Sequence, residues 1–177
     1  ELEVSTQKIN QSIEDLHETN PMLGHRGCRL GITYPEITKM QANAIFSASA
    51  QLINEGITPL PEIMIPLIGT AEEFIHQRDV IVDVYNEMGV EVEHKIGTMI
   101  EIPRACLVAE QIAEHADFFS FGTNDLTQTT FGFSRDDIGS FIQDYFDNNI
   151  LIEDPFKTLD INGVGVLIKG AVKQGRK

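Results

Sequence analysis

The sequence predicts an α/β fold built on a parallel sheet or barrel. Three short, nearly continuous apolar runs, at residues 62–68, 95–102 and 118–122, indicate strands that are covered on both faces. Patterns typical of amphipathic helices lie between these runs, and the connections are short. Repeated alternation of strand and helix is the signature of parallel α/β architectures.

Two helices are predicted before the first strand. Apolar residues spaced four and three positions apart predict a helix over 8–19, which ends before Pro21 because the residue preceding a proline is disfavoured in the α region. A longer helix over 34–55 has Pro35 in its first turn and stops at Gly56.

Helices also follow each predicted strand. A capping pattern at Thr70 begins a helix that runs to about Met88, where Gly89 closes it. After the second strand, Pro103 begins a helix through about His115. The remaining apolar patterns predict helices over 126–130, 137–147 and 163–173.

Composition limits the classes of partner. Of the 177 residues, 42% are hydrophobic, which suits a folded domain or part of one, and the formal net charge is −14. Such an acidic chain is a poor match for nucleic acid or an anionic membrane surface. No run approaches the ~18–20 apolar residues of a membrane span, so we expect a cytoplasmic protein. Because the chain begins at Glu1 rather than Met, we expect a piece of a longer one.

Cys28 and Cys106 show neither ligand spacing nor a CxxC pattern. We expect two reduced, buried thiols rather than a disulfide or a zinc site. His25 has no partner at ligand spacing and is expected to be structural. Gly163 and Gly165 resemble a dinucleotide loop, but no predicted strand precedes them, so that motif is discounted.

Polar residues stand where two predicted strands finish, which is where parallel α/β proteins bind ligands. Glu101 lies at the end of KIGTMIEI, and Asn124 and Asp125 follow FFSFG. Two carboxylates from neighbouring strands suit Mg²⁺, which takes oxygen ligands and is usually held by one or two protein carboxylates. The alternative is that Glu101 pairs with an arginine or lysine and Asp125 caps a helix beginning at Leu126.

Three arginines flank these strand ends in the sequence. Arg26 and Arg29 lie in LGHRGCRL, and Arg135 lies in FGFSRDD. A guanidinium can bind a carboxylate or a phosphate through two parallel hydrogen bonds, so this set suggests a small, multiply charged substrate. The alternative is that Arg29 and Arg135 form ion pairs with neighbouring acids, namely Glu36, Asp136 or Asp137.

Four segments together carry a family resemblance. They are NPMLGHRGCRL (20–30), EIMIPLIG (62–69), GTMIEIPRA (97–105) and FFSFGTNDLTQTTFGFSRDD (118–137). They resemble the C-terminal, phosphoenolpyruvate-binding domain of the phosphoenolpyruvate-utilising enzymes. This group includes pyruvate, phosphate dikinase, phosphoenolpyruvate synthase and enzyme I of the sugar phosphotransferase system. GTNDLTQ is shared across the group, whereas TFGFSRDD, GHRGCRL and TYPEI are similar to the dikinases in particular.

The resemblance implies a (β/α)₈ TIM barrel with phosphoenolpyruvate or pyruvate at the carboxyl ends of its strands. Residues 1–177 would form one incomplete barrel domain that lacks the early strands and the last strand. The nucleotide-binding and phosphohistidine domains would be absent from this chain. The complete enzyme would be a homodimer, and its phosphohistidine domain would be the partner of this barrel.

The resemblance also implies site residues. Glu101 and Asp125 match the Mg²⁺ ligands of the substrate site, and Arg26 and Arg135 match arginines that bind the substrate. The substrate-binding strand end corresponds to Gly122, Thr123, Asn124 and Asp125. The family's catalytic cysteine lies in a Cys-Gly-x-Cys-Gly-Glu-His stretch that is missing here, so no catalytic residue is assigned.

The implied activity is that of a phosphotransferase, which interconverts ATP, pyruvate and phosphate with AMP, phosphoenolpyruvate and diphosphate through a phosphohistidine. This segment would carry part of the Mg²⁺-dependent pyruvate site and would be inactive alone. The alternatives are a phosphoenolpyruvate synthase, an enzyme I domain, or a non-catalytic barrel fragment that acts only in binding.

Overall fold

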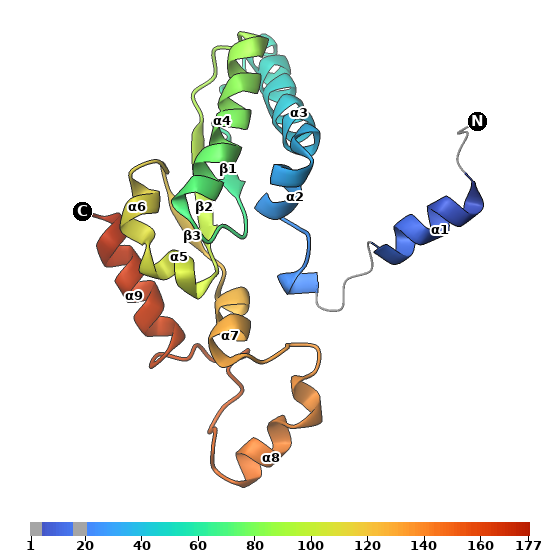
Figure 1. Cartoon of the computed structure of the whole chain (residues 1–177). Coiled ribbons are helices and arrows are strands. Elements are labelled where there is room, and N and C mark those ends of the chain that lie inside the picture. The colour runs from blue at the N-terminus through green and yellow to red at the C-terminus, as the bar shows by residue number, and fades with distance from the viewer. Residues whose placement is uncertain (1–4, 16–20) are drawn as a thin grey trace.

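A computed structural model describes residues 5–15 and 21–177. At its centre is a parallel three-stranded sheet in the order β1-β2-β3 (Figure 1). The strands are β1 (Glu62–Ile65), β2 (Lys95–Ile100) and β3 (Phe119–Phe121). The predicted α/β class with a parallel sheet is therefore confirmed, as are the three strand positions and their order.

β1 is shorter than the apolar run that predicted it. Its last residue, Ile65, pairs with Thr98 of β2, and the last residue of β2, Ile100, pairs with Phe121 of β3. β1 stops at Ile65 because Pro66 has no N–H to contribute to the ladder and Leu67 has a φ of 60°, outside the extended region.

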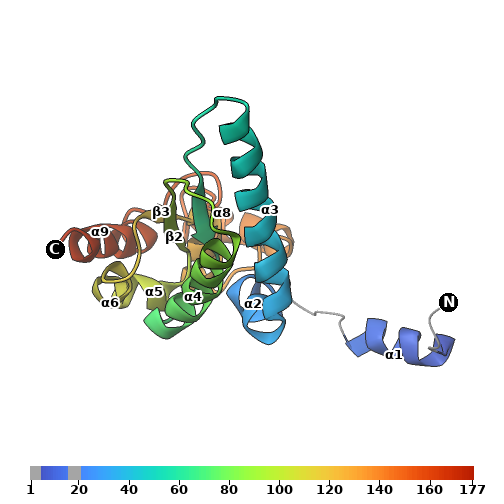
Figure 2. The same cartoon turned by 90° about the horizontal axis from the view of Figure 1, so that it is seen from above.

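Helices surround the sheet in two groups (Figures 1 and 2). In one group α2 packs on α3 and α4, and in the other α9 packs on α5, α6 and α7. The amino-terminal helix α1 stands apart from both groups in the two views. The α-helices are α1 (Thr6–Asp15), α2 (Cys28–Thr33), α3 (Pro35–Asn54), α4 (Ala71–Met88), α5 (Pro103–Leu107), α6 (Ala109–Ala113), α7 (Thr123–Phe131), α8 (Ile142–Asp147) and α9 (Val164–Gly175), and the 3₁₀ turns are η1 (Pro21–Leu23) and η2 (Ile138–Ser140).

The predicted ends of α4 are confirmed in atomic detail. The N–H of Glu73 donates to Thr70 Oγ1 at 3.1 Å, and the Glu73 carboxylate accepts from the N–H of Thr70 at 3.0 Å, which completes a capping box. Gly89 ends the helix with a φ of 62°.

Three helix predictions need correction. The helix predicted over 103–115 is two helices, α5 and α6, because Val108 has a non-helical φ of −113° and ψ of 21°. The helix predicted from residue 126 begins at Thr123. The helix predicted over 137–147 is the 3₁₀ turn η2 followed by the short helix α8, because Phe141 between them has a non-helical φ of −138°. The short helix α2 was not predicted. The end of the helix predicted over 8–19 lies outside the described residues.

The core lies between the sheet and its helices, where Phe46, Phe74 and Ile100 are fully buried. Both cysteine thiols are buried as predicted, and burial raises the pKa of Cys28 and of Cys106 to about 11. In the described residues the sheet does not close, since β1 and β3 each pair on one side only. No described helix has the length and apolar character to cross a bilayer.

Candidate metal and substrate site

The carboxyl ends of the three strands lie side by side. β1 leads into the loop Pro66–Gly69, β2 leads into Glu101, and β3 leads through Gly122 into helix α7. The N–H of Gly122 donates to the Ile100 carbonyl at 3.1 Å, so the β2–β3 pairing continues to the edge of the sheet. The polar residues predicted at these strand ends therefore meet at one edge.

Glu101 is the most enclosed acid of this edge, with 5% of its surface exposed. Its Oε1 accepts the N–H of Leu67 at 2.7 Å. On the opposite side, a Cβ on Gly122 would lie 2.7 Å from Glu101 Cβ and 2.9 Å from its Oε2. The Glu101 carboxylate is thus held between the backbones that follow β1 and β3.

Asp125 lies in the first turn of α7, where its carboxyl group is close enough to Glu101 to act on the Glu101 pKa. Burial raises the pKa of Glu101, and the neighbouring Asp125 carboxyl raises it further. The Leu67 N–H and the nearby Arg26 charge act in the opposite direction. The structure therefore brings together the two carboxyl groups that the strand ends predicted.

The structural alternative for these two acids is wrong. Asp125 does not cap a helix beginning at Leu126, because α7 begins at Thr123 and Gly122 is its N-cap. Within the described part of the chain, Glu101 forms no ion pair with a lysine or arginine.

Arg135 and Asn124 meet beside the carboxyl pair. Arg135 Nη1 donates to Asn124 Oδ1 at 3.0 Å, and the Arg135 backbone N–H donates to Gln128 Oε1 at 2.9 Å. Both bonds tie the exposed Arg135 to α7, and neither acid beside it in sequence forms an ion pair with it. Arg26 is also exposed, at the loop before α2.

Arg29 has a structural position instead. Its Nη1 donates to the carbonyl of Gly24 at 2.9 Å and to that of Met22 at 3.5 Å, which braces the loop before α2. The ion pair considered for Arg29 is therefore replaced by hydrogen bonds to backbone carbonyls. His25 Nε2 lies 2.9 Å from Thr33 Oγ1, which agrees with the structural role expected of this histidine.

The carboxyl pair fits a magnesium ion better than a metal that needs a full protein cage. The described residues contain no group of three or more His, Cys, Asp or Glu placed to hold a metal. Mg²⁺ is commonly held by one or two carboxylates, with water and substrate oxygens as the other ligands. Two adjacent carboxyl groups repel when both are ionised, and a bound cation removes that repulsion.

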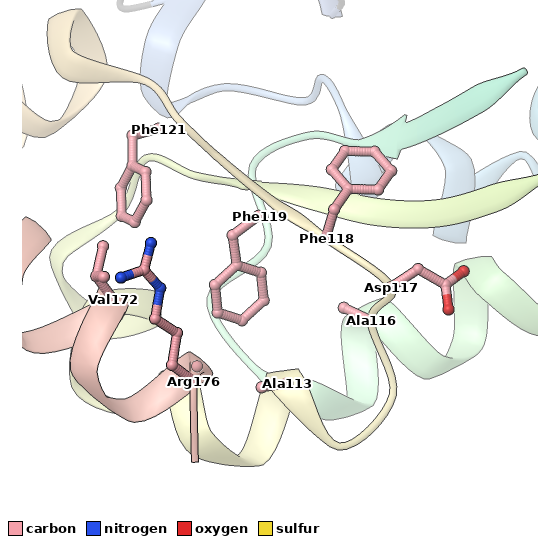
Figure 3. A pocket seen from close by; sticks show the side chains of 9 residues that line it. Ala113, Ala116, Asp117, Phe118, Phe119, Phe121, Val172 and Arg176 are labelled. Carbon is pink, nitrogen blue, oxygen red and sulfur yellow. The ribbon is translucent and has the colours of Figure 1, made fainter.

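Two cavities lie away from the carboxyl pair. One of about 550 Å³ lies against β1, α2 and α3, and includes Ile45 and Met64 in its lining. Another, of about 220 Å³, lies beside β3, where Arg176 and Val172 face Phe119 and Phe121 (Figure 3). Neither is lined by the carboxyl pair, so the site is recognised from its chemistry and its place at the strand ends.

Sequence reasoning missed two contributions to this site. The N–H of Leu67 binds Glu101, and Gly122 leaves room for it. The first depends on the left-handed φ of Leu67, for which the local sequence has no signal. Gly122 was predicted as part of the strand end, but the clash that a Cβ would make appears only in three dimensions.

Comparison with known proteins places the chain in a family. The model of the "PEP-utilising enzyme, PEP-binding domain" matches residues 2–177. The chain is 58% identical over 177 residues to "Pyruvate, phosphate dikinase, chloroplastic" of Flaveria trinervia, covering 98% of this chain and 19% of that protein. It is 59% identical over 169 residues to "Pyruvate, phosphate dikinase 1, chloroplastic" of Oryza sativa subsp. japonica, covering 93% of this chain and 18% of that protein.

A third relative gives the same picture. "Pyruvate, phosphate dikinase 2" of Zea mays is 60% identical over 169 residues, covering 93% of this chain and 19% of that protein. The chain thus spans about a fifth of the length of the relatives it matches. The cytoplasmic location predicted for this chain stays a prediction beside plant relatives named as chloroplastic. The chain belongs to the phosphoenolpyruvate-utilising enzymes, whose PEP-binding domain it matches over nearly its whole length.

Proposed function

We propose that this chain carries part of the Mg²⁺-dependent phosphoenolpyruvate and pyruvate site of a pyruvate, phosphate dikinase. The observation that supports this most directly is the pair of carboxyl groups, from buried Glu101 and half-buried Asp125, that follows the ends of β2 and β3. The dikinase relatives, similar over 93–98% of this chain, support the choice within the family. The whole reaction would interconvert ATP, pyruvate and phosphate with AMP, phosphoenolpyruvate and diphosphate through a phosphohistidine.

The corresponding proposal for the fold is a segment of a (β/α)₈ barrel. Consecutive parallel neighbours joined through helices, as in β1-β2-β3, are what such a segment contains. Residues 1–177 would be one incomplete barrel domain. The nucleotide-binding and phosphohistidine domains and the dimer partner would come from the complete enzyme.

Glu101 and Asp125 would hold the Mg²⁺. When bound, the ion supplies positive charge that stabilises an oxygen on which negative charge develops, such as that of an enolate. Glu101 Oε1 accepts the Leu67 N–H and Oε2 lies on the side of Gly122, and the carboxylate would keep lone pairs with which to bind the cation. Enclosure of Glu101 keeps water from competing for this position.

The substrate would be bound by groups around α7. The helix begins at Thr123 without a side-chain cap, so the N–H groups of its first turn are available to an anionic oxygen. Asn124 holds one nitrogen of Arg135 and so orients a guanidinium whose other N–H groups can bind phosphate or carboxylate. Arg26 would add a second positive charge from the loop before α2.

Neither thiol of this chain suits the proton transfer at the methyl carbon of pyruvate. Cys28 and Cys106 are 1% and 2% exposed, and burial raises the pKa of each to about 11. A buried, protonated thiol is a poor general base near neutral pH. We therefore assign the proton transfer to a cysteine outside these residues and expect the chain alone to be inactive.

The proposal is tested by Asp125→Ala in a complete dikinase that contains this domain. Turnover of pyruvate should be abolished while ATP still phosphorylates the histidine, because the metal site serves only the second half-reaction. Asp83→Ala, on the exposed face of α4, is the matched control and should leave both half-reactions intact. Normal pyruvate turnover by Asp125→Ala, or loss of both half-reactions together, would contradict the assigned role.

A further inference from the structure

We propose that the backbone N–H of Leu67 is a positioning group that fixes the Glu101 carboxylate for metal binding, and that Gly27 and Cys28 hold this N–H in place. The inference rests on the proposed function, because it concerns the ligand that Glu101 would provide. It adds three residues to the site that touch neither metal nor substrate. They act through the conformation of the loop after β1.

Leu67 has an unusual backbone for its residue type. Among the described residues only Leu67 and Asn149 are non-glycine residues with positive φ, at 60° and 57°. Asparagine tolerates this region, whereas leucine pays a steric penalty between its Cβ and the backbone. Strained conformations of this kind persist only where the surroundings impose them, and they concentrate at functional sites.

The surroundings of Leu67 impose the conformation from both sides of one peptide group. The N–H of Cys28 donates to the carbonyl of Pro66 at 3.2 Å, and the N–H of Leu67, in the same peptide group, donates to Glu101 Oε1 at 2.7 Å. The Cys28 thiol also donates to the Leu67 carbonyl at 3.3 Å. Cys28 therefore fixes the orientation of the peptide whose N–H points at Glu101.

Gly27 allows the backbone before α2 to lie directly against Leu67. Its own φ is 58°, and a Cβ at this position would lie 2.9 Å from Leu67 Cδ1 and 3.0 Å from Leu67 Cβ. The Leu67 side chain is 5% exposed, so it has little room to move away. The left-handed Gly27 and the left-handed Leu67 thus pack directly against each other, and any side chain at 27 would displace the loop that binds Glu101.

A hydrogen bond that orients a metal ligand has a measurable consequence. Outer partners of this kind set the direction of the ligand, and their loss typically lowers metal affinity about 10–100-fold. A hydrogen bond that only satisfied a buried carboxylate would change stability and leave the affinity of the correctly folded protein unchanged. Metal affinity and stability therefore separate the two roles.

The first test removes the Leu67 N–H and keeps the side chain. Leu67 is replaced by its α-hydroxy analogue, which converts the amide to an ester, and Mn²⁺ binding is titrated by electron paramagnetic resonance. The matched control is the same change at Gly69, whose N–H donates to Glu73 Oε2 at 2.6 Å in the same loop. We expect affinity to fall about tenfold for the ester at 67 and to be unchanged for the ester at 69.

The second test moves Leu67 without touching its N–H. Gly27→Ala is compared with Gly89→Ala, because both glycines have a positive φ, 58° and 62°, and a Cβ at 27 would meet Leu67 whereas nothing lies within 4 Å of a Cβ at 89. The ψ angles differ, −135° at Gly27 and 27° at Gly89, so alanine is more strained at 27, and Mn²⁺ affinity is therefore compared in the folded proteins only. Gly27→Ala should weaken Mn²⁺ binding and Gly89→Ala should not. This pair decides the matter if the ester at 67 does not fold.

The outcomes separate the two proposals. Equal Mn²⁺ affinity in the folded Leu67 ester and the unmodified chain, or equal losses in Gly27→Ala and Gly89→Ala, would overturn the positioning role and leave the metal site standing. No Mn²⁺ binding by the unmodified chain, or binding that Asp125→Asn does not alter, would overturn the metal site itself, and the role of Leu67 with it.

Discussion

The glutamates at the two ends of the sheet differ in exposure and in the charge of the residue beside them. At the amino ends of β1 and β2, Glu62 and Lys95 face each other across the register, with Lys95 Nζ 3.5 Å from Glu62 Oε1 and both side chains more than half exposed. At the carboxyl ends, Glu101 is buried and its neighbour is another acid, Asp125. Stability alone would favour the reverse, with the opposite charge beside the buried acid. The like-charged pair is therefore the end of the sheet that indicates function.

The largest expected difference between the two ends is in metal binding. Glu101→Gln removes an anionic oxygen ligand and should lower Mn²⁺ affinity by more than the ~10–100-fold typical of losing an outer partner. Glu62→Gln should leave it unchanged. Titration of both variants with Mn²⁺ makes the comparison, and equal affinities would place the metal elsewhere.

The next largest difference is expected in the unfolding free energy of two glycine-to-alanine variants. Gly122→Ala forces a methyl group to within 2.9 Å of Glu101 Oε2 and Met99 Sδ, and overpacking of this kind costs about 1–3 kcal/mol of unfolding free energy. Gly170→Ala, in α9 with nothing within 4 Å of its Cβ, should instead add up to about 1 kcal/mol through helix propensity. Urea denaturation measures both, and a neutral Gly122→Ala would show that the strand end can relax.

Glu101→Gln, which should lose metal affinity, is expected to gain stability, and this gain is the next effect in size. The raised pKa of Glu101 means that the unfolded chain ionises first, so this group's contribution to stability is complete below the ordinary glutamate pKa of 4.5 and is lost as pH rises through the folded value. Glutamine keeps an acceptor for the Leu67 N–H and carries no charge. The variant should therefore melt at a higher temperature than the parent at pH 7.

That advantage should shrink as the pH is lowered below 4.5, where Glu101 is protonated in both states. Thermal melts at pH 4 and pH 7 test the sign. A Glu101→Gln variant that is less stable than the parent at pH 7 would mean that the charged carboxylate stabilises the fold.

The smallest effect belongs to the exposed pair. Lys95→Met removes the ion pair with Glu62 and should change the unfolding free energy by less than about 1 kcal/mol, because water and salt screen exposed charges. The difference from the parent should vanish in 1 M NaCl, as thermal melts at low and high salt would show. A larger loss of unfolding free energy that does not depend on salt would contradict the expectation that the exposed pair contributes little to stability.

The sequence was sufficient for the strands and for the acids at their ends. Apolar runs at 62–68, 95–102 and 118–122 predicted three parallel neighbours, because continuous apolar character is required of a strand covered on both faces. Glu101 near the end of the second run and Asp125 just after the third then predicted that the two acids would meet. Both inferences use local pattern and sheet topology only.

Features that depend on distant contacts could not be predicted. Leu67 is left-handed because Gly27 and Cys28, the latter 39 residues away, pack and bond against it. The non-helical Val108 interrupts a sequence whose pattern fits one helix. The start of α7 at Thr123 was also missed, since no side-chain cap marks it and the break at Gly122 suggested a loop.

The order of the sheet also has a consequence for synthesis. Each strand pairs with the strand that precedes it along the chain, so the sheet grows at one edge and no strand must be inserted between two others. β3 ends roughly 20 residues after β2, a stretch that a ribosome adds in about 1–4 s at the usual 5–20 residues per second. Each new strand can therefore dock on an edge that is already present, in the order in which translation delivers it.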